Sequence, residues 1–315
     1  MGKTKSLLSF TGGYPAFLES DYARRVSALT RTGIIETLPG LGRPGVIGID
    51  GAEYSLPALD QVLSLFATNA DFLRGKVSQG FDRLELVPMA APASRLMSRM
   101  QDAIVAHGAE GKIFRTGQTA SGPSIPVRVN KEKIVWIWET LREAFTANEL
   151  VYFPKRYVPI DHGGKTKLEA LHDPRICAVP GWSIALTESA SIMPAQGQGA
   201  SIGGRKQIET GLSPNEYLRL LKEPGYEGET GKTLEDFITG FTTRLDECDE
   251  VSNDVDDNNA AWCLAHYLKI SYADLVPTGR WHRSVGRVRL DMHRSNNKRC
   301  TKSFGAPTVV RLGLN

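Results

Sequence analysis

The sequence predicts an α+β protein, and three observations along its C-terminal half carry that prediction. Residues Trp182 to Thr187 alternate in polarity, as a strand with one buried face does. Two helix starts follow, at Ser213 and Thr233, and each precedes apolar residues at helical spacing. From Trp262 onward the apolar residues come in short pieces, which predict several strands and a closing strand at Thr308–Leu312.

The length of the chain is compatible with one large domain or two ordinary ones. The chain has 315 residues, of which 41% are hydrophobic and 23% are charged, so it can form a core and is not a disordered chain. A stretch rich in Gly, Ser, Thr and Pro, from Arg115 to Asn130, is the candidate boundary. We therefore expect a smaller, mixed α/β accessory domain of unknown role at residues 1–130 and a second domain at 131–315.

The N-terminal part predicts two short strands and two helices. Gly45–Gly51 predicts a strand closed by an Asp-Gly turn, and Leu84–Pro88 predicts another strand. A helix is expected to start at Pro57 and another after Pro92. The residues expected on their apolar faces are Leu59, Val62, Leu63, Phe66 and Phe72 in the first helix, and Leu96, Met100, Ile104 and Val105 in the second.

The middle of the chain predicts a short helix, Glu139 to Phe145, between two apolar runs, Val135–Trp138 and Leu150–Pro154. We expect the aromatic residues of these runs to pack in the core or between domains.

Residues Gly40 to Gly45 match the letters of a dinucleotide-binding motif, GxGxxG. That motif needs a strand before it and a helix starting within it, so that the helix N-terminus meets a pyrophosphate. Here a strand is expected after the motif, and Pro44 interrupts it. The pattern therefore favours a turn, and no nucleotide cofactor is expected.

The two C-terminal helices have strong start signals. Ser213 can cap the first helix, Pro214 fits its first turn, and Glu216 can accept a bond from the cap N–H. Thr233 caps the second, whose expected inward residues are Phe237, Ile238, Phe241 and Leu245.

Charge and targeting signals exclude some partners. The net charge is +3 and the charges are mixed, so no specific nucleic-acid partner is expected. Basic residues dominate only in the window from Arg280 to Lys302, where Asp291 is the one acid. No apolar run approaches the length of a membrane span, and the N-terminus lacks the apolar region of a signal peptide.

No arrangement of residues indicates catalysis. The six histidines form no HxH or HExxH motif, and no nucleophile signature is present. The four cysteines, Cys177, Cys248, Cys263 and Cys300, form no CxxC pair, so free or buried thiols are expected and no metal site is predicted. A disulfide between Cys248 and either Cys263 or Cys300 stays open. We therefore expect no catalytic residues and no cofactor.

The segment Asn253–Asn259 is rich in the oxygen ligands that calcium prefers. An EF-hand starting at Asp254 fails, because Asn259 replaces its glycine and Ala265 its bidentate acid. A solvated loop is favoured, while other calcium geometries stay open.

Several segments resemble the variable proteins of diversity-generating retroelements, which occur in bacteria, archaea and their viruses. The matching segments are 203–209 (GGRKQIE), 213–218 (SPNEYL), 228–237 (GETGKTLEDF) and 305–312 (GAPTVVRL). Val276-Pro277, Trp281, Arg283 and Arg287 also match. The resemblance covers roughly the last 115 residues of the 315. Pro307 stands where the family usually has Arg, which puts side-chain packing there in doubt.

The resemblance implies a C-type lectin fold, in which the first and last strands pair, two helices flank them and a small antiparallel sheet carries a binding face. It also implies a mechanism: a reverse transcriptase copies a template repeat while randomising adenines, and the copy replaces the end of the gene. Randomised AAY codons never give Lys, Glu, Gln, Met or Trp. The implied partner is a protein or cell-surface ligand, and the implied location is the cytoplasm or a virus particle. The oligomeric state stays open.

This codon rule sorts the residues of a variable region at about 276–303. Trp281, Met292 and Lys298 cannot arise from such codons, and Arg283, Arg287 and Leu290 match fixed family positions, so these residues are expected to be scaffold. The expected variable, ligand-binding positions are Arg280, His282, Ser284, Val285, Arg289, Asp291, His293, Arg294 and Asn296.

Two other functions stay open at this stage. One is a fixed carbohydrate-binding lectin that uses calcium near Asp254. The other is an enzyme on a related fold, since formylglycine-generating oxidases share this architecture, and it would need Cys263 or Cys300 at its reactive site.

Overall fold

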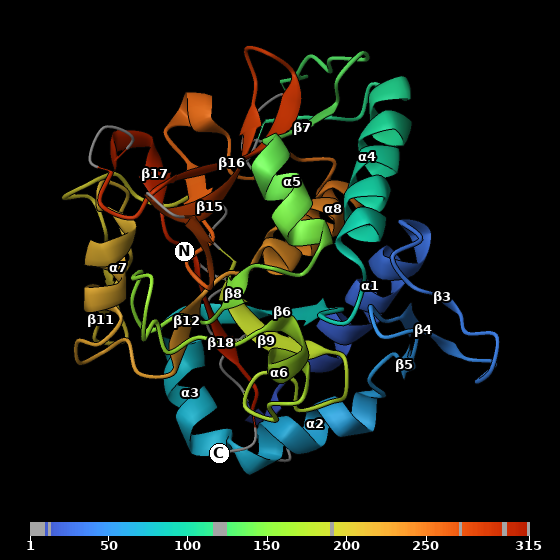
Figure 1. The fold of residues 1–315 in the computed structure, drawn as a ribbon. Coiled ribbons are helices and arrows are strands. Elements are labelled where there is room, and N and C mark those ends of the chain that lie inside the picture. The colour runs from blue at the N-terminus through green and yellow to red at the C-terminus, as the bar shows by residue number, and fades with distance from the viewer. Residues whose placement is uncertain are drawn as a thin grey trace.

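The computed structural model describes residues 10–11, 14–115, 125–189, 192–270, 273–297 and 301–313 (Figure 1). Its helices are α1 (Leu18–Arg31), α2 (Leu59–Thr68), α3 (Ala70–Ser78), α4 (Ala93–Ala109), α5 (Glu139–Thr146), α6 (Lys167–Leu171), α7 (Pro214–Leu220) and α8 (Leu234–Cys248). Two 3-10 turns are η1 (Val255–Asp257) and η2 (Thr301–Ser303).

The strands up to residue 188 are β1 (Phe10–Thr11), β2 (Tyr14–Pro15), β3 (Glu36–Thr37), β4 (Pro44–Ile47), β5 (Glu53–Ser55), β6 (Phe81–Val87), β7 (Val135–Ile137), β8 (Val151–Tyr152) and β9 (Ser183–Glu188). The later strands are β10 (Ser201–Ile202), β11 (Arg205–Lys206), β12 (Glu229–Gly231), β13 (Ala260–Trp262), β14 (His266–Ile270), β15 (Ala273–His282), β16 (Arg287–Arg294), β17 (Phe304–Gly305) and β18 (Thr308–Arg311). The mixture of helices and sheets confirms the α+β class.

A four-stranded antiparallel sheet with the order β12-β18-β9-β6 forms the centre of the molecule. The predicted pairing of the first and last C-terminal strands is present, with Val310 opposite Leu186. The prediction that this first strand has one buried face is wrong. Residues 183–187 are all buried, because β9 lies between two partner strands and inside the core.

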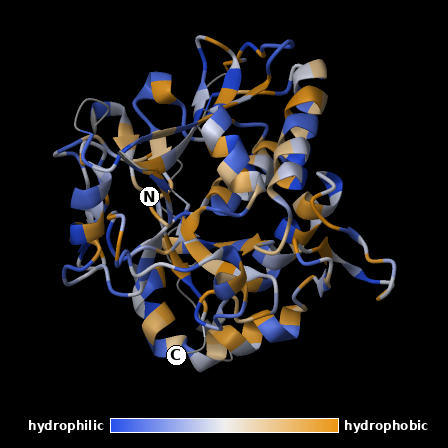
Figure 2. Cartoon of the chain, in the orientation of Figure 1, coloured by the Kyte–Doolittle hydropathy of each residue, from blue (hydrophilic) through white to orange (hydrophobic). Residues whose placement is uncertain are grey.

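The strand β6 joins the two segments that the sequence analysis separates at residue 130. It pairs with β9 from Phe81 to Val87. One hydrophobic core cluster runs from Phe17 to Leu312, so both segments contribute to the same core. Figure 2 shows hydrophobic residues concentrated on the central strands and on the inward faces of the helices.

A buried arginine links the same two segments. Arg25 of α1 is 1% exposed and donates hydrogen bonds to Leu84 O at 2.8 Å, to Thr243 Oγ1 at 2.8 Å and to Glu247 Oε1 at 2.9 Å. Since Thr243 and Glu247 belong to α8, this side chain connects the first helix to the longest C-terminal one. A buried, fully partnered guanidinium fixes the position of α1 relative to α8, because another arrangement of the two helices would leave a charge unpaired.

A second, seven-stranded sheet holds the residues expected to bind ligand. Its main path is β17-β13-β15-β14-β8, and β16 adds to β15 and also pairs with β7. The two long strands β15 and β16 form a hairpin at one end of the molecule (Figure 1).

The expected helix starts are present. Ser213 N–H donates to Glu216 Oε2 at 2.8 Å, and Asp236 N–H donates to Thr233 Oγ1 at 3.0 Å. The residues expected to face inward from α8, namely Phe237, Ile238, Phe241 and Leu245, are all buried.

The N-terminal elements are confirmed with two corrections. A turn at residues 39–41 leads into the strand β4, which begins at Pro44 within the glycine motif, so the turn interpretation of the motif is confirmed. Phe72 is not on the apolar face of α2, because α2 ends at Thr68. Phe72 lies on the next helix, α3, and is 42% exposed. Val105 is 47% exposed on α4, outside the buried stripe.

The structure bears on two further predictions, that the cysteines are free or buried thiols and that the chain has no membrane span. Cys177, Cys248 and Cys263 are free thiols, and Cys177 and Cys263 are buried. Cys300 and Lys298 lie outside the described residues. Within the described part of the chain, no helix has both the length and the apolar character needed to cross a bilayer.

Candidate ligand-binding face

The pairing of β15 with β16 decides which side chains share a face. The strands are antiparallel, and their register runs from Leu275 opposite Arg294 to His282 opposite Arg287. Directly opposed residues in such a pair point to the same side of the sheet, and the side alternates along each strand. The two faces of the hairpin can therefore be assigned residue by residue.

One side of the hairpin is apolar and buried. Trp281 pairs with Val288, and Gly279 pairs with Leu290. Trp281, Val288 and Leu290 are each 0% exposed, and the Trp281 ring stacks on Phe241 of α8 with 6.2 Å between centroids. Trp281 and Leu290, both expected to be scaffold, therefore anchor the hairpin to the core.

The other side is polar, and we name it the hairpin face. The register places eight residues on it, of which Val276 and Thr278 are fully buried, and the other six are Arg280, His282, Arg287, Arg289, Asp291 and His293. Five of them are among the nine expected variable positions, and Arg287 is the expected scaffold residue among them. Ser284 and Val285 lie in the turn between the strands. Arg294 and Asn296 lie at the other end of the hairpin, away from the turn. Most of this window is paired strand.

Asp291 holds two arginines of the hairpin face together. Its Oδ2 accepts from Arg289 Nε at 3.0 Å and from Arg280 Nη2 at 3.3 Å. Arg280 and Arg289 are opposite each other in the register, so without this carboxylate two like charges would adjoin.

Aromatic rings lie under both guanidinium groups. The Arg280 guanidinium carbon is 5.3 Å from the centroid of Phe304, and that of Arg289 is 4.3 Å from the centroid of Trp136. Both separations are within the range of cation–π attraction. Trp136 belongs to β7, which pairs with β16 and places this ring beside Arg289.

Two of the expected variable positions are not surface positions. Arg280 is 6% exposed and Asp291 is 7% exposed, because Phe304 covers this part of the hairpin face. Arg289 and His282 keep more of their side chains in solvent, 32% and 27% respectively. The accessible part of the face is therefore its turn end.

The two histidines of the face differ in surroundings. His293 packs edge-on against Trp262 and Phe304, and burial lowers its pKa although the nearby Asp291 opposes the shift. The Nδ1 of His282 is 3.0 Å from Ser284 Oγ, and burial lowers its pKa against the attraction of Asp256. The lowered pKa values favour the neutral form of both imidazoles at pH 7.

The acidic segment around η1 holds the turn of the hairpin. Arg283 Nη1 is 2.9 Å from Asp257 Oδ2 and 3.2 Å from Asp254 Oδ2. The Ser284 N–H donates to Asp256 at 2.8 Å, and Arg115 also pairs with Asp257. Burial raises the pKa of Asp254 to about 6. Arginines thus form ion pairs with carboxylates that could otherwise bind calcium. The described residues contain no group of three or more His, Cys, Asp or Glu placed to hold a metal.

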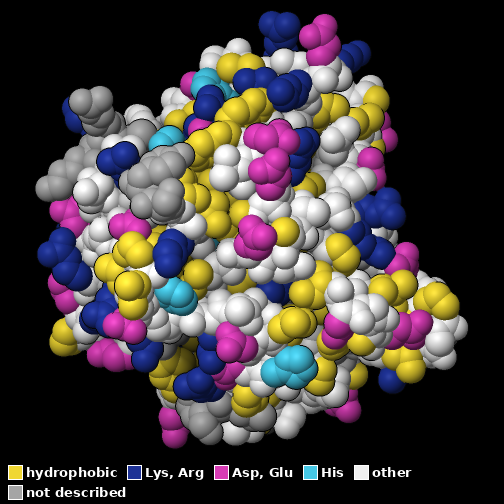
Figure 3. Space-filling model, in the orientation of Figure 1, with side chains coloured by type: hydrophobic (Ala, Val, Ile, Leu, Met, Phe, Trp, Pro, Cys, Tyr) yellow, Lys and Arg dark blue, Asp and Glu magenta, His cyan; other side chains and the backbone are white. Residues whose placement is uncertain are grey.

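Figure 3 shows basic side chains and a histidine gathered at the end of the molecule where Figure 1 places the hairpin. Trp136 and Phe304 were not predicted as members of this site. The aromatic residues around Trp136 were expected in packing roles, and no local pattern indicates that either ring meets an arginine far away in the sequence.

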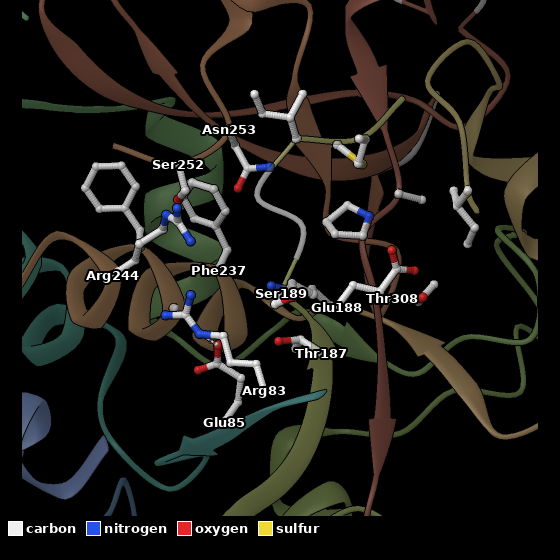
Figure 4. A pocket seen from close by; sticks show the side chains of 18 of the residues that line it. Arg83, Glu85, Thr187, Glu188, Ser189, Phe237, Arg244, Ser252, Asn253 and Thr308 are labelled. Atoms are coloured by element: carbon white, nitrogen blue, oxygen red, sulfur yellow. Dashed lines mark ion pairs between the residues drawn. The ribbon is translucent and has the colours of Figure 1, made fainter. Parts of the chain in front are cut away.

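A separate cavity of about 90 Å³ lies between β6, β9 and α8. Figure 4 shows Arg83, Glu85 and Arg244 on one side of it and Glu188 on the other. Arg83 Nη2 is 3.3 Å from Glu247 Oε2, and Arg244 Nη2 is 2.5 Å from Glu250 Oε2. Glu188 Oε1 is 2.6 Å from Arg205 Nη1. Since these charges pair within the protein, the cavity offers a ligand little electrostatic attraction.

No protein-family profile, curated protein or solved structure matches this chain.

Proposed function

We propose that this chain is a non-enzymatic ligand-binding protein whose hairpin face recognises a protein or cell-surface target. The observation that carries the proposal is the register of β15 and β16, which gathers five of the nine expected variable residues on one polar face. The expected scaffold residues Trp281 and Leu290 lie on the opposite, buried face. The two described residues of this window that the codon rule excludes, Trp281 and Met292, both lie on that buried face.

The chemistry of the face suits recognition of a folded surface. Arg289 offers a planar guanidinium backed by the ring of Trp136, and arginine with aromatic rings is a combination enriched at binding hot spots. The residues that keep the hairpin in place, Arg283 and Trp281, are held by Asp257 and by Phe241. Exposed positions at the turn can then change with little effect on stability.

The fold supports the same proposal. We infer a C-type lectin arrangement for the C-terminal half, and its expected features are the pairing of β9 with β18 and the capped helices α7 and α8. We further infer that retroelement-directed adenine mutagenesis diversifies the hairpin. Under this proposal, the positions that vary freely are the accessible ones, His282, Ser284, Val285, Arg289, Arg294 and Asn296.

The deciding experiment is to sequence the locus in related isolates. We expect a near-identical template repeat near the gene, with adenines in the codons for the accessible positions, and a reverse-transcriptase gene beside it. Substitutions between isolates should concentrate at those codons and spare Trp281 and Leu290. A locus with neither a repeat nor a reverse transcriptase, and with substitutions spread evenly along the gene, would refute diversification.

A binding experiment tests the face itself. A display library randomised at His282, Ser284, Val285 and Arg289 should yield folded binders to several unrelated protein targets, because the scaffold is fixed elsewhere. The matched control is a library randomised at four exposed residues distant from the hairpin, such as Lys222, Glu223, Glu227 and Arg219. Binders from the control library at equal frequency would count against a specialised face.

A further inference from the structure

A second site lies at the opposite end of the molecule from the hairpin. It is a pocket of about 440 Å³, formed where α3, the segment after β8 and the end of β18 meet. In Figure 1, α3 and the C-terminus lie far from β16. This volume falls within the range of ligand pockets, about 300–1,000 Å³. Residues in the segments 173–176 and 228–230 also line it, and since these segments are distant in sequence the pocket is a product of the tertiary fold.

One part of the pocket wall is apolar. Phe72, Leu73, Phe153 and Leu312 line it. Phe72 is 42% exposed, so part of its ring is in contact with solvent. A Cβ at Gly228 would lie 2.3 Å from Phe72 Cζ, so the ring rests directly on this glycine and is held in place. An apolar ligand group placed against Phe72 would remove exposed aromatic surface from water.

The rest of the lining is strongly basic. Lys155, Lys165, Arg175 and Arg311 line the pocket, and Asp173 is the only acid among the lining residues that the structure describes. Arg175 Nη2 and Lys165 Nζ share the Asp173 carboxylate, at 2.7 Å and 3.2 Å from Oδ2. Lys155 has no ion-pair partner within the described residues, and positive charge is therefore in excess.

Two buried polar atoms of the lining residues lack partners. Thr230 Oγ1 and Arg311 Nε have no hydrogen-bond partner in the described part of the protein. The Arg311 side chain is 4% exposed, and its terminal nitrogens bind Asp236 while its guanidinium carbon lies 5.0 Å from the Phe153 ring centroid. A buried donor without an acceptor costs about 1–3 kcal/mol, and Arg311 therefore has hydrogen-bonding capacity that no described residue uses.

We propose that this pocket binds a small amphipathic organic anion. Its carboxylate or phosphate group lies among Lys155, Lys165 and Arg311, and its aromatic or branched aliphatic group lies against Phe72 and Phe153. The site is independent of the hairpin face, with which it shares no lining residue.

The test is calorimetric titration of the full chain with matched probes. These are phenylbutyrate, phenylbutyl phosphate, the uncharged phenylbutanol and the cationic phenylbutylamine. We expect at least one of the two anions to bind about tenfold or more tightly than the alcohol, and the amine not to bind, since tenfold corresponds to one charge-assisted contact. The two anions distinguish carboxylate from phosphate recognition.

Variants locate the site. Lys155→Gln should weaken binding of the anions about tenfold and leave the alcohol unchanged. Phe72→Ala should weaken the anions and the alcohol alike, because it removes the apolar wall. Lys133→Gln, an exposed lysine outside the pocket, is the matched control and should bind as the unmodified chain does.

Three results would overturn the proposal. They are equal affinity for phenylbutyrate, phenylbutyl phosphate and phenylbutanol, unchanged anion binding by Lys155→Gln, and no binding of either anion at about 10 mM. Thermal unfolding of each variant shows whether it is folded. Lys155 is exposed, so Lys155→Gln should unfold at the same temperature as the unmodified chain.

Discussion

The guanidinium carbon of Arg289 lies 4.3 Å from the centroid of the Trp136 ring, although the two residues are far apart in the chain. The parallel pairing of β16 with β7 brings them together, with Arg289 directly opposite Trp136. This contact fixes an arginine that is still 32% exposed on the candidate face. The contact therefore restricts the positions that the Arg289 guanidinium can take at the accessible end of the hairpin face.

The first prediction concerns this contact. A double-mutant cycle with Trp136→Leu and Arg289→Met should give a coupling free energy of about 0.5–1 kcal/mol in urea unfolding, the size of a partly exposed cation–π pair. The control cycle replaces Arg289→Met with Arg294→Met, an exposed arginine of the same strand. Coupling of equal size in both cycles would mean that the ring and Arg289 do not interact.

The second prediction separates buried from accessible positions among the expected variable residues. Asp291→Ala leaves the buried Arg280 guanidinium beside Arg289 without their shared carboxylate, and should cost about 3 kcal/mol of unfolding free energy. Arg294→Ala should change that free energy by no more than about 0.5 kcal/mol. Chemical denaturation measures both. If Asp291→Ala were as mild as Arg294→Ala, the carboxylate would not be needed to hold the two arginines.

The sequence predicted well those features that depend on near neighbours in the chain. The caps at Ser213 and Thr233 and the inward stripe of α8 are set by residues within one or two helical turns, so the pattern contains all the information needed. The closing strand β18 was predicted too, and its pairing with β9 followed from the family resemblance.

Features that depend on distant residues could not be read from the pattern. The codon rule separates residues by the codons that can produce them, and this property has no relation to burial. Phe304 covers Arg280 only because β17 pairs with β13, which places the ring over the hairpin face. Likewise, the pairing of β6 with β9 joins residue 81 to residue 188, and a strand pattern alone does not name its partner.

The third prediction concerns calcium. Arg283 pairs with Asp254 and Asp257, and Arg115 pairs with Asp257, so calcium would have to displace these arginines. A site with a dissociation constant of about 1 mM would stabilise the protein by about 1.4 kcal/mol at 10 mM calcium. We expect no such effect, and the unfolding temperature should change by less than about 1 °C. A chelator-reversible rise of several degrees would instead favour the calcium-dependent lectin.

The last prediction concerns acid. His266 is 0% exposed, and burial lowers its pKa from 6.5 to about 4, although the neighbouring Glu235 opposes the shift. The unfolded chain therefore binds a proton at this residue between pH 6.5 and 4 that the folded protein does not bind. Stability is lost as the pH falls through this window, by up to about 3 kcal/mol for a shift of this size. Unfolding in urea at several pH values measures the loss.

His266→Gln removes the titrating group, and Gln can still accept the bond that Leu234 N–H donates to His266 Nδ1 at 3.2 Å. The variant should lose less stability than the unmodified chain between pH 6.5 and 4.5, and any loss from carboxylate protonation in this range is common to both chains. His172→Gln, a change at an exposed histidine, is the control and should leave the acid dependence unchanged. Parallel pH curves for the unmodified chain and His266→Gln would show that His266 is not the group whose protonation unfolds the protein.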